Sequence, residues 1–158
     1  MAFAKIVAAT DFSSGSVAAL AAASLIARSD GAEVVVAHAL ETPTVFGGEL
    51  PVPTEVIEEL KDDALQGLEH AQRDVRALGV SRVSSQLLVG VVGGLLSFVE
   101  SSKADLVVVG THGRTGMSRI LLGSMAEKIV RLAPCSVLVA RSDHELVRFS
   151  HVLCAVDG

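Results

Sequence analysis

Short apolar runs alternate with longer segments of helical pattern along this chain. The run "AEVVVAHAL" is rich in β-branched residues and lacks apolar–polar alternation, which is typical of a strand covered on both faces. Similar runs occur before and after it. The pattern predicts strands over residues 3–11, 32–40, 81–90, 104–110 and 136–140.

The segments between these runs predict helices. Residues 14–31 are rich in Ala and Leu, with Ser13 or Ser14 available as a cap and Gly31 as a stop. A long helix is expected from Thr54 to Leu78, followed by a short one over 93–102 and another around Ser124 to Leu132. The long helix should bury one stripe of residues spaced by three and four, namely Ile57, Leu60, Ala64, Leu68, Ala71, Val75 and Leu78.

The order βαβαβαβαβ predicts an α/β fold of the Rossmann-like kind. Helical crossovers of this type produce an open five-stranded parallel sheet with helices on both faces. Ligands of such sheets bind at the carboxyl ends of the strands, near the change in winding direction. The stretches "TDFSS" and "GTHGRTG", which follow the first and fourth strands, should therefore converge.

Composition narrows the function classes. The chain has 158 residues, the length of one domain, and its formal net charge is −5, which argues against nonspecific nucleic-acid binding. Trp and Tyr are absent, so the aromatic platforms of single-strand or carbohydrate binders are not expected. No apolar run is long enough to span a membrane, and the start lacks the form of a signal peptide. These features predict a cytoplasmic protein without membrane or nucleic-acid partners.

Two cysteines are too few for a disulfide framework, and neither has a metal-type partner at short spacing. Cys135 and Cys154 are therefore expected to be small buried hydrophobic residues. His38 lies within an apolar strand, where a satisfied core histidine is the more common role. His70, His144 and His151 are expected at the surface.

Glycines and a serine after the fourth strand suggest an anion site. Gly110 and Gly113 would let a phosphate approach the backbone, and Gly123 and Ser124 would open a helix whose N-terminus attracts anions. Ser124 could also cap that helix and donate its hydroxyl to a phosphate. Neither the P-loop signature nor the G-x-G-x-x-G dinucleotide signature is present.

The same region carries most of the positive charge. Residues 110–141 hold five basic residues and one acidic residue, Glu127, which is a net charge of +4. Since the whole chain has a net charge of −5, the other residues together carry −9. A basic segment on an acidic protein suggests a small anionic ligand. A solvated helix face is an equally good interpretation of the charge alone.

These motifs resemble the nucleotide-binding branch of the universal stress protein family. The family's pattern G-x2-G-x9-G-[S/T] is matched by Gly110, Gly113, Gly123 and Ser124, and "TDFSS" and "APCSVLVAR" also fit. The resemblance covers residues 3 to 141, so the domain is placed at 1–141. It implies the strand order 3-2-1-4-5 and a homodimer that pairs through the fifth strand, at the sheet edge.

The resemblance also implies a set of nucleotide contacts. Asp11 would accept hydrogen bonds near the ribose and adenine, with a helix-start Asp as its alternative role. Ala9 and Thr10 would line the same pocket, and Ala39 would read the base through its backbone. Val109 would pack on the base. The ribose and phosphates would be held by Gly110, His112, Gly113, Arg114, Gly123, Ser124 and Met125. His112 has no visible carboxylate partner, so it is read as a turn residue near the ligand.

An ATP-binding regulatory protein of the stress response is the function that the resemblance implies. ATP is expected first, with AMP or ADP as alternatives and magnesium as a companion of the triphosphate. Apart from Asp11 no carboxylate near the motif suits base work, so no catalytic residue or protein metal site is assigned and at most slow hydrolysis is expected. The alternative is a nucleotide-free dimerising interaction module. An adenylyl transferase would need signatures that this chain lacks.

The end of the chain repeats its beginning. "FSHVLCAVDG" aligns with "FAKIVAATDF" at an offset of 146 residues, which places Phe149 on Phe3 and Asp157 on Asp11. Residues 142–158 are therefore interpreted as a linker and a partial first strand of a second tandem domain. That segment either frays or pairs with a sheet edge, and Asp157 is not counted as a ligand.

Overall fold

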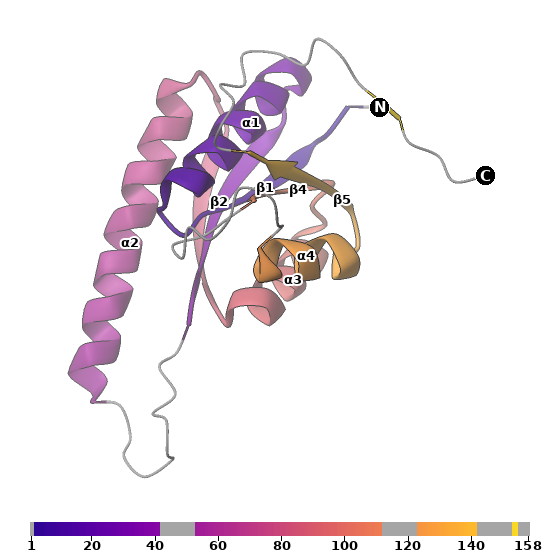
Figure 1. Ribbon diagram of the computed structural model, residues 1–158. Helices are drawn as coiled ribbons and strands as arrows, with labels where there is room; N and C mark the ends of the chain where they lie inside the picture. Colours follow the sequence, from indigo (N-terminus) through magenta and orange to yellow (C-terminus); the bar gives the residue numbers. More distant parts are fainter. Residues whose placement is uncertain (1, 42–52, 112–122, 142–152, 155–158) are drawn as a thin grey trace.

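The computed structural model describes residues 2–41, 53–111, 123–141 and 153–154. A five-stranded parallel sheet of order β3-β2-β1-β4-β5 lies between two layers of helices (Figure 1). The predicted fold class and strand order are confirmed. The elements are β1 (Lys5–Ala9), α1 (Ser14–Asp30), β2 (Glu33–Leu40), α2 (Thr54–Ala77), β3 (Val83–Val89), α3 (Val91–Ser102), β4 (Leu106–Gly110), α4 (Ser124–Leu132) and β5 (Ser136–Ala140).

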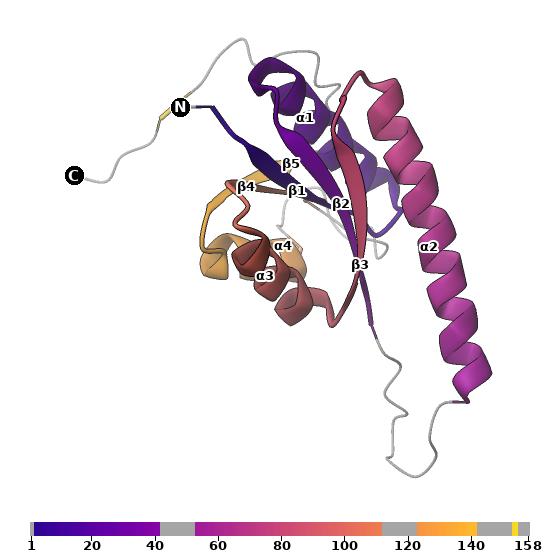
Figure 2. The same ribbon diagram turned by 180° about the vertical axis from the view of Figure 1, so that it is seen from behind.

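The two faces of the sheet form separate cores. Helices α1 and α2 cover one face and α3 and α4 the other, as the two opposite views show (Figures 1 and 2). Along β1, Ile6 and Ala8 belong to the first core, whereas Val7 and Ala9 belong to the second. Because successive side chains of a strand point to opposite faces, a strand buried on both sides must be apolar throughout.

Helix α1 begins and ends where its sequence predicted, but its cap differs. Ser13 is the N-cap residue in an extended conformation, yet its side chain makes no capping hydrogen bond. Its hydroxyl donates instead to Asp11. The helix ends at Gly31, whose φ of 68° is the left-handed conformation that glycine adopts without strain.

Helix α2 is longer than the sheet surface it covers. Ala64, Leu68, Ala71 and Val75 are buried as predicted. The outer members of the predicted stripe are not, because Leu60 is 37% and Leu78 43% exposed. In Figure 1 the first turns of α2 extend past the ends of the strands, so no sheet lies beneath them. Helix α3 also begins earlier than predicted, at Val91, because Gly90 forms its N-cap.

The expectation of two buried cysteines is wrong for Cys154 and only partly met by Cys135. Cys135 is half-buried and packs against the core under α3 and α4. Burial raises the pKa of its thiol, and the nearby charge of Asp105 adds to that effect. Cys154 is exposed, since it lies on the C-terminal tail beside Leu153, which is 95% exposed. His70 is exposed as expected, while His144 and His151 lie outside the described residues.

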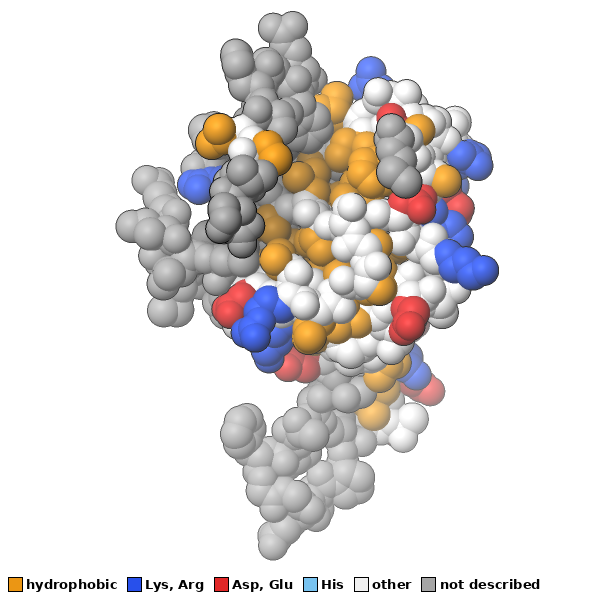
Figure 3. All heavy atoms as spheres, turned by 90° about the vertical axis from the view of Figure 1, so that its right-hand side faces the viewer, with side chains coloured by type: hydrophobic (Ala, Val, Ile, Leu, Met, Phe, Trp, Pro, Cys, Tyr) orange, Lys and Arg blue, Asp and Glu red, His pale blue; other side chains and the backbone are white. Residues whose placement is uncertain are grey.

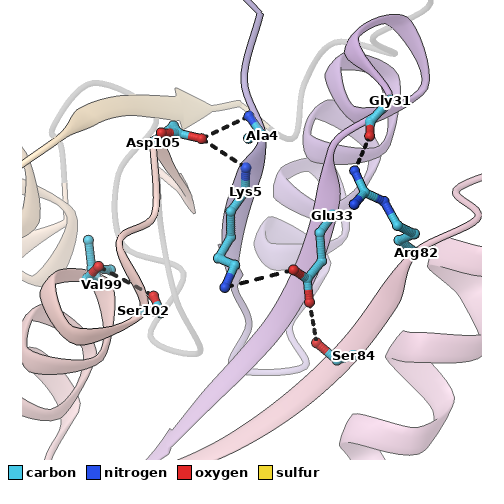
Figure 4. A network of polar contacts seen from close by, with 9 residues as sticks. All are labelled: Ala4, Lys5, Gly31, Glu33, Arg82, Ser84, Val99, Ser102 and Asp105. Carbon is cyan, nitrogen blue, oxygen red and sulfur yellow. Dashed lines mark hydrogen bonds and ion pairs between the residues drawn. The ribbon is translucent and has the colours of Figure 1, made fainter.

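A polar network ties the amino ends of the central strands together (Figure 4). Asp105 accepts the backbone N–H groups of Ala4 and Lys5 at 2.8 and 2.9 Å. The Lys5 ammonium lies 3.8 Å from Glu33. The backbone hydrogen bonds from Lys5 and Ala4 lower the pKa of Asp105, because they favour its charged form.

In the described part of the chain, no helix is both long and apolar enough to cross a membrane.

Candidate functional site

The central strand β1 ends before its two neighbours. It pairs with β2 as far as Ala9, opposite Ala37, and with β4 as far as Ala8, opposite Val108. Strand β2 continues to Leu40, and β4 continues to Gly110. The chain winds from β1 toward β2 and β3 on one side, and β4 and β5 lie on the other. The end of β1 is therefore the switch point at which such sheets bind ligands.

Thr10, the residue after β1, is buried, and both its N–H and its hydroxyl form hydrogen bonds. It is 6% exposed, and its N–H donates to the carbonyl of Ala37 at 2.9 Å. Its hydroxyl donates to Ser16 Oγ at 2.9 Å and accepts the N–H of Phe12 at 3.0 Å. The Thr10 side chain thus holds the turn between β1 and α1 together.

Asp11 lies half-buried at the start of α1. Its Oδ1 accepts the N–H of Ser13 at 3.1 Å and the Ser13 hydroxyl at 2.5 Å. A carboxylate is also favoured here by the N-terminal end of the helix dipole. The structure thus places Asp11 at the predicted end of β1 and shows a helix-start role for it.

The sequence predicted no role for Phe12, although the residue lies within "TDFSS". Its φ is 64°, in the left-handed region that a bulky residue rarely adopts. Its ring stacks on His38 with centroids 4.4 Å apart. His38 is 8% exposed and its Nδ1 lies 2.8 Å from the Thr10 carbonyl, so the expected satisfied core histidine is confirmed.

Gly110 ends β4 directly against α1. A Cβ atom at this position would lie 2.7 Å from the carbonyl oxygen of Gly15, in the first turn of α1. Real side chains do not tolerate that distance, so only glycine fits. This requirement adds to the predicted one, which was the close approach of an anion.

The two ends of the glycine-rich segment meet beside β4. The N–H of Thr111 donates to the carbonyl of Ala140 at 3.0 Å, and the N–H of Gly123 donates to the carbonyl of Thr111 at 2.9 Å. The predicted residues His112, Gly113 and Arg114 lie between these ends, outside the described residues. Thr111 and Gly123 thus lie together at the carboxyl end of the sheet.

Helix α4 begins at the same place. Its N-cap is Gly123, in an extended conformation, so Ser124 is the first helical residue and not the cap that its sequence suggested. The first bond of the helix runs from the N–H of Glu127 to the carbonyl of Gly123 at 2.9 Å. In an α-helix the N–H groups before that bond, here those of Ser124, Met125 and Ala126, have no intrahelical acceptor.

The remaining predicted contacts lie on the α3 and α4 side of the sheet. Ala9 is 7% and Val109 0% exposed, and both belong to that core. Ala39 and Met125 are half-buried and pack against it. Ala39 pairs with Leu88 of β3, beyond the end of β1. The side chain of Val109 is thus core in this structure, while Ala39 and Met125 retain accessible surface.

Part of the basic segment lies on α4, within the described residues. Lys128 and Arg131 are exposed on α4, and Arg131 lies 3.9 Å from Glu127 one turn away. This part is a solvated helix face. Arg114 and Arg119 lie outside the described residues. Among the side chains that are described, no group of three or more His, Cys, Asp or Glu is arranged to hold a metal ion.

Two relatives illustrate the similarity in sequence. The universal stress protein MJ0531 of Methanocaldococcus jannaschii is 37% identical over 139 residues, which are 87% of this chain and 81% of the relative. A Thermus aquaticus universal stress protein, from the 3′ region of the QAH/OAS sulfhydrylase gene, is 36% identical over 146 residues, with 88% and 99% of the two chains covered.

Solved structures of universal stress proteins are similar to this chain as well. A crystal structure of a universal stress protein in complex with cAMP superposes with a TM-score of 0.71 at 26% identity, covering 90% of this chain and 99% of that one. The Archaeoglobus fulgidus universal stress protein in complex with dAMP gives 0.63 at 25% identity, covering 89% and 99%. The model of the universal stress protein family matches residues 2–141. The chain belongs to the universal stress protein family.

Proposed function

We propose that this protein binds an adenine nucleotide, preferentially ATP, at the carboxyl ends of β1 and β4. The observation that carries the proposal is the meeting of two helix N-termini at the end of β4. Gly15 of α1 packs against Gly110, and Gly123, which opens α4, is bonded to Thr111. Two helix N-termini beside one strand end favour a negatively charged ligand. The related structures that hold cAMP and dAMP support adenine as the base.

The roles of the residues follow from their chemistry. The N–H groups of Ser124, Met125 and Ala126 and the Ser124 hydroxyl bind phosphate oxygens. Asp11 accepts hydrogen bonds from the ribose hydroxyls. Ala39 and Met125, which keep accessible surface, flank the adenine. The segment with His112, Gly113 and Arg114 completes the phosphate site, and magnesium accompanies the triphosphate.

The protein acts as a regulatory binding module of the stress response, and ATP is hydrolysed slowly at most. Fast hydrolysis needs a base and charge stabilisation at the reacting phosphate. Asp11 is the carboxylate at the end of β1, and its Oδ1 accepts two bonds from Ser13. We place the protein in the cytoplasm.

Calorimetric titration and thermal unfolding with ATP, AMP and GTP test the proposal. A ligand at 100 times its dissociation constant stabilises the folded state by about 2.7 kcal/mol. ATP should therefore raise the melting temperature clearly, and GTP less. No shift with millimolar ATP, together with no adenine nucleotide released from heat-denatured purified protein, would refute it.

We also propose a homodimer through β5. This strand is at the edge of the sheet, and Val137, Leu138 and Val139 are half-buried. Val130 and Leu132 of the neighbouring α4 are 47% and 61% exposed. Figure 3, seen from the right-hand side of Figure 1, shows apolar side chains across this face of the molecule. Pairing with a second copy would satisfy the free edge.

The second candidate function, a nucleotide-free interaction module, rests on this same apolar edge. The two candidates differ in one measurement. A module of that kind would dimerise and show no thermal shift with any nucleotide.

A further inference from the structure

The turn between β1 and α1 holds Phe12 in a conformation that its own backbone disfavours. A φ of 64° is rare for a bulky residue, and such a residue persists only where its surroundings determine it. The surroundings here come from two elements distant in sequence, β2 and α2.

Strand β2 contributes His38 in two ways. Its ring stacks on Phe12 at an interplanar angle of 27°, and its Nδ1 bonds to the carbonyl of Thr10 at 2.8 Å. The residue before Asp11 and the residue after it are thus both held by the same buried side chain.

Helix α2 contributes Gly67, a residue without a side chain. A Cβ atom on Gly67 would lie 2.7 to 2.9 Å from three atoms of the Phe12 ring. The ring therefore occupies the space that any larger residue at position 67 would need. Phe12 is 37% exposed, and its ring contacts His38 and the α2 backbone at Gly67.

Asp11 lies in this turn between β1 and α1. Both hydrogen bonds from Ser13, one from its N–H and one from its hydroxyl, reach the same carboxylate oxygen, Oδ1, so a shift of the backbone at Phe12 and Ser13 would change how the carboxylate is held. We propose that Phe12, in contact with His38 and Gly67, is a positioning residue for Asp11 that couples α2 to the nucleotide site. The coupling to nucleotide rests on the proposed function, whereas the positioning of Asp11 by Gly67 and Phe12 does not.

Coupling of this kind works in both directions. If a change in α2 alters nucleotide affinity through Phe12, then bound nucleotide must alter the energetics of α2 by the same factor. Binding of nucleotide would then change the stability of helix α2 through the contact between Phe12 and Gly67.

The test is Gly67→Ala in the full chain. The added methyl displaces the Phe12 ring, and the ATP dissociation constant measured by calorimetry should rise about 5-fold or more, the usual lower range of such coupling. Gly93→Ala is the matched control, because Gly93 is also helical and an added Cβ there meets nothing within 4 Å. That variant should bind ATP as the parent does.

A second variant separates positioning from general destabilisation. Phe12→Gly removes the ring and suits the positive φ, so Gly67→Ala should cause no further loss of affinity in the Phe12→Gly background. Additive losses would overturn the proposal. If Gly67→Ala fails to fold, Phe12→Gly alone must still weaken ATP binding, and unchanged affinity would overturn the proposal.

A readout without nucleotide keeps the two proposals distinguishable. The Ser13 amide, bonded to Asp11 Oδ1, should exchange hydrogen faster in Gly67→Ala than in Gly93→Ala. If the parent protein binds no nucleotide, the proposed function fails, and this exchange still decides whether Gly67 and Phe12 hold Asp11. If the parent binds ATP and both glycine variants bind equally well, the positioning proposal fails and the proposed function stands.

Discussion

Gly110 matters both for the fold and for the proposed site, because its backbone lies close against α1. The residue ends β4, and α1 begins against it, with the Gly15 carbonyl where a side chain would stand. The same close packing brings the N-terminus of α1 next to the end of β4, where phosphate is proposed to bind. Stability and binding are therefore expected to change together at this position.

Gly110→Ala should destabilise the protein by about 1–3 kcal/mol, because the methyl group collides with a backbone atom that cannot rotate away. For a domain of this size, each kcal/mol lowers the melting temperature by about 2–4 °C. Thermal unfolding by circular dichroism measures the effect. Gly93→Ala, with open space around it, should melt at or above the parent temperature, and equal melting of both variants would contradict the argument.

Asp105 is the residue whose charge should make stability depend on acid. Its pKa is lowered by the hydrogen bonds from the N–H groups of Lys5 and Ala4. A group with a lowered folded pKa contributes stability above its unfolded pKa of about 4 and loses it as pH falls through the folded value. Its contribution is therefore complete at neutral pH and is lost progressively as the pH falls below about 4.

Asp105→Asn should lower the melting temperature at pH 7, since a neutral amide accepts these two bonds more weakly than a carboxylate. The difference from the parent should shrink as the pH is lowered from about 4 toward 2. Melting curves of both proteins across that range provide the measurement. Asp62→Asn, on the exposed side of α2, is the charge control, and a gap that stays constant with pH would disprove the role of the Asp105 charge.

Among the elements, β3 and β5 form the two edges of the sheet, and they differ in surroundings. Strand β5 lies beside the exposed Val130 and Leu132 of α4, and β3 is followed closely by α3. The Thr111 N–H bonds to the Ala140 carbonyl, so the polar backbone groups of Ala140 face β4. Because these groups alternate in direction along a strand, the N–H of Val139 faces the open edge.

Val139→Pro should therefore convert the proposed dimer into a monomer while the sheet stays intact, since proline is tolerated at an edge where its N–H is not needed. Light scattering on a size-exclusion column measures the mass. Val89→Pro is the matched control on β3. The neighbouring Gly90 N–H bonds to Leu40, so the N–H of Val89 also faces outward. A parent monomer at micromolar concentration, or equal masses for both variants, would reject pairing through β5.

At the scale of the whole molecule, we propose that residues 142–158 lie outside the domain, as a linker and a partial repeat of the first strand. The described part of this tail contacts little, because Leu153 is 95% exposed and Cys154 is exposed. Deleting residues 146–158 should thus leave the melting temperature and the oligomeric state unchanged. A lower melting temperature or a changed mass would show instead that the tail pairs with a sheet edge.

The sequence alone was sufficient for the order of elements and the placement of the candidate motifs. Apolar runs without alternation identify strands buried on two faces, as β1 and β2 are, and the glycines after β4 mark the candidate site. Local pattern could not set the limits of the buried stripe on α2, since Leu60 fits the spacing where the helix extends past the sheet, and Leu78 fits it but follows the last residue of the helix. It also missed the exposure of Cys154, since an apolar run does not reveal whether a partner covers it.

What only the tertiary structure decided is which residues meet across the chain. Phe12 is an ordinary residue in "TDFSS" until β2 brings His38 against its ring and α2 brings Gly67. Gly110 is required because the first turn of α1 crosses the end of β4. Such contacts depend on how helices lie on the sheet. The sequence determines which segments are helices and strands through local periodicity, and close packing between distant segments then selects the residues that the candidate site can use.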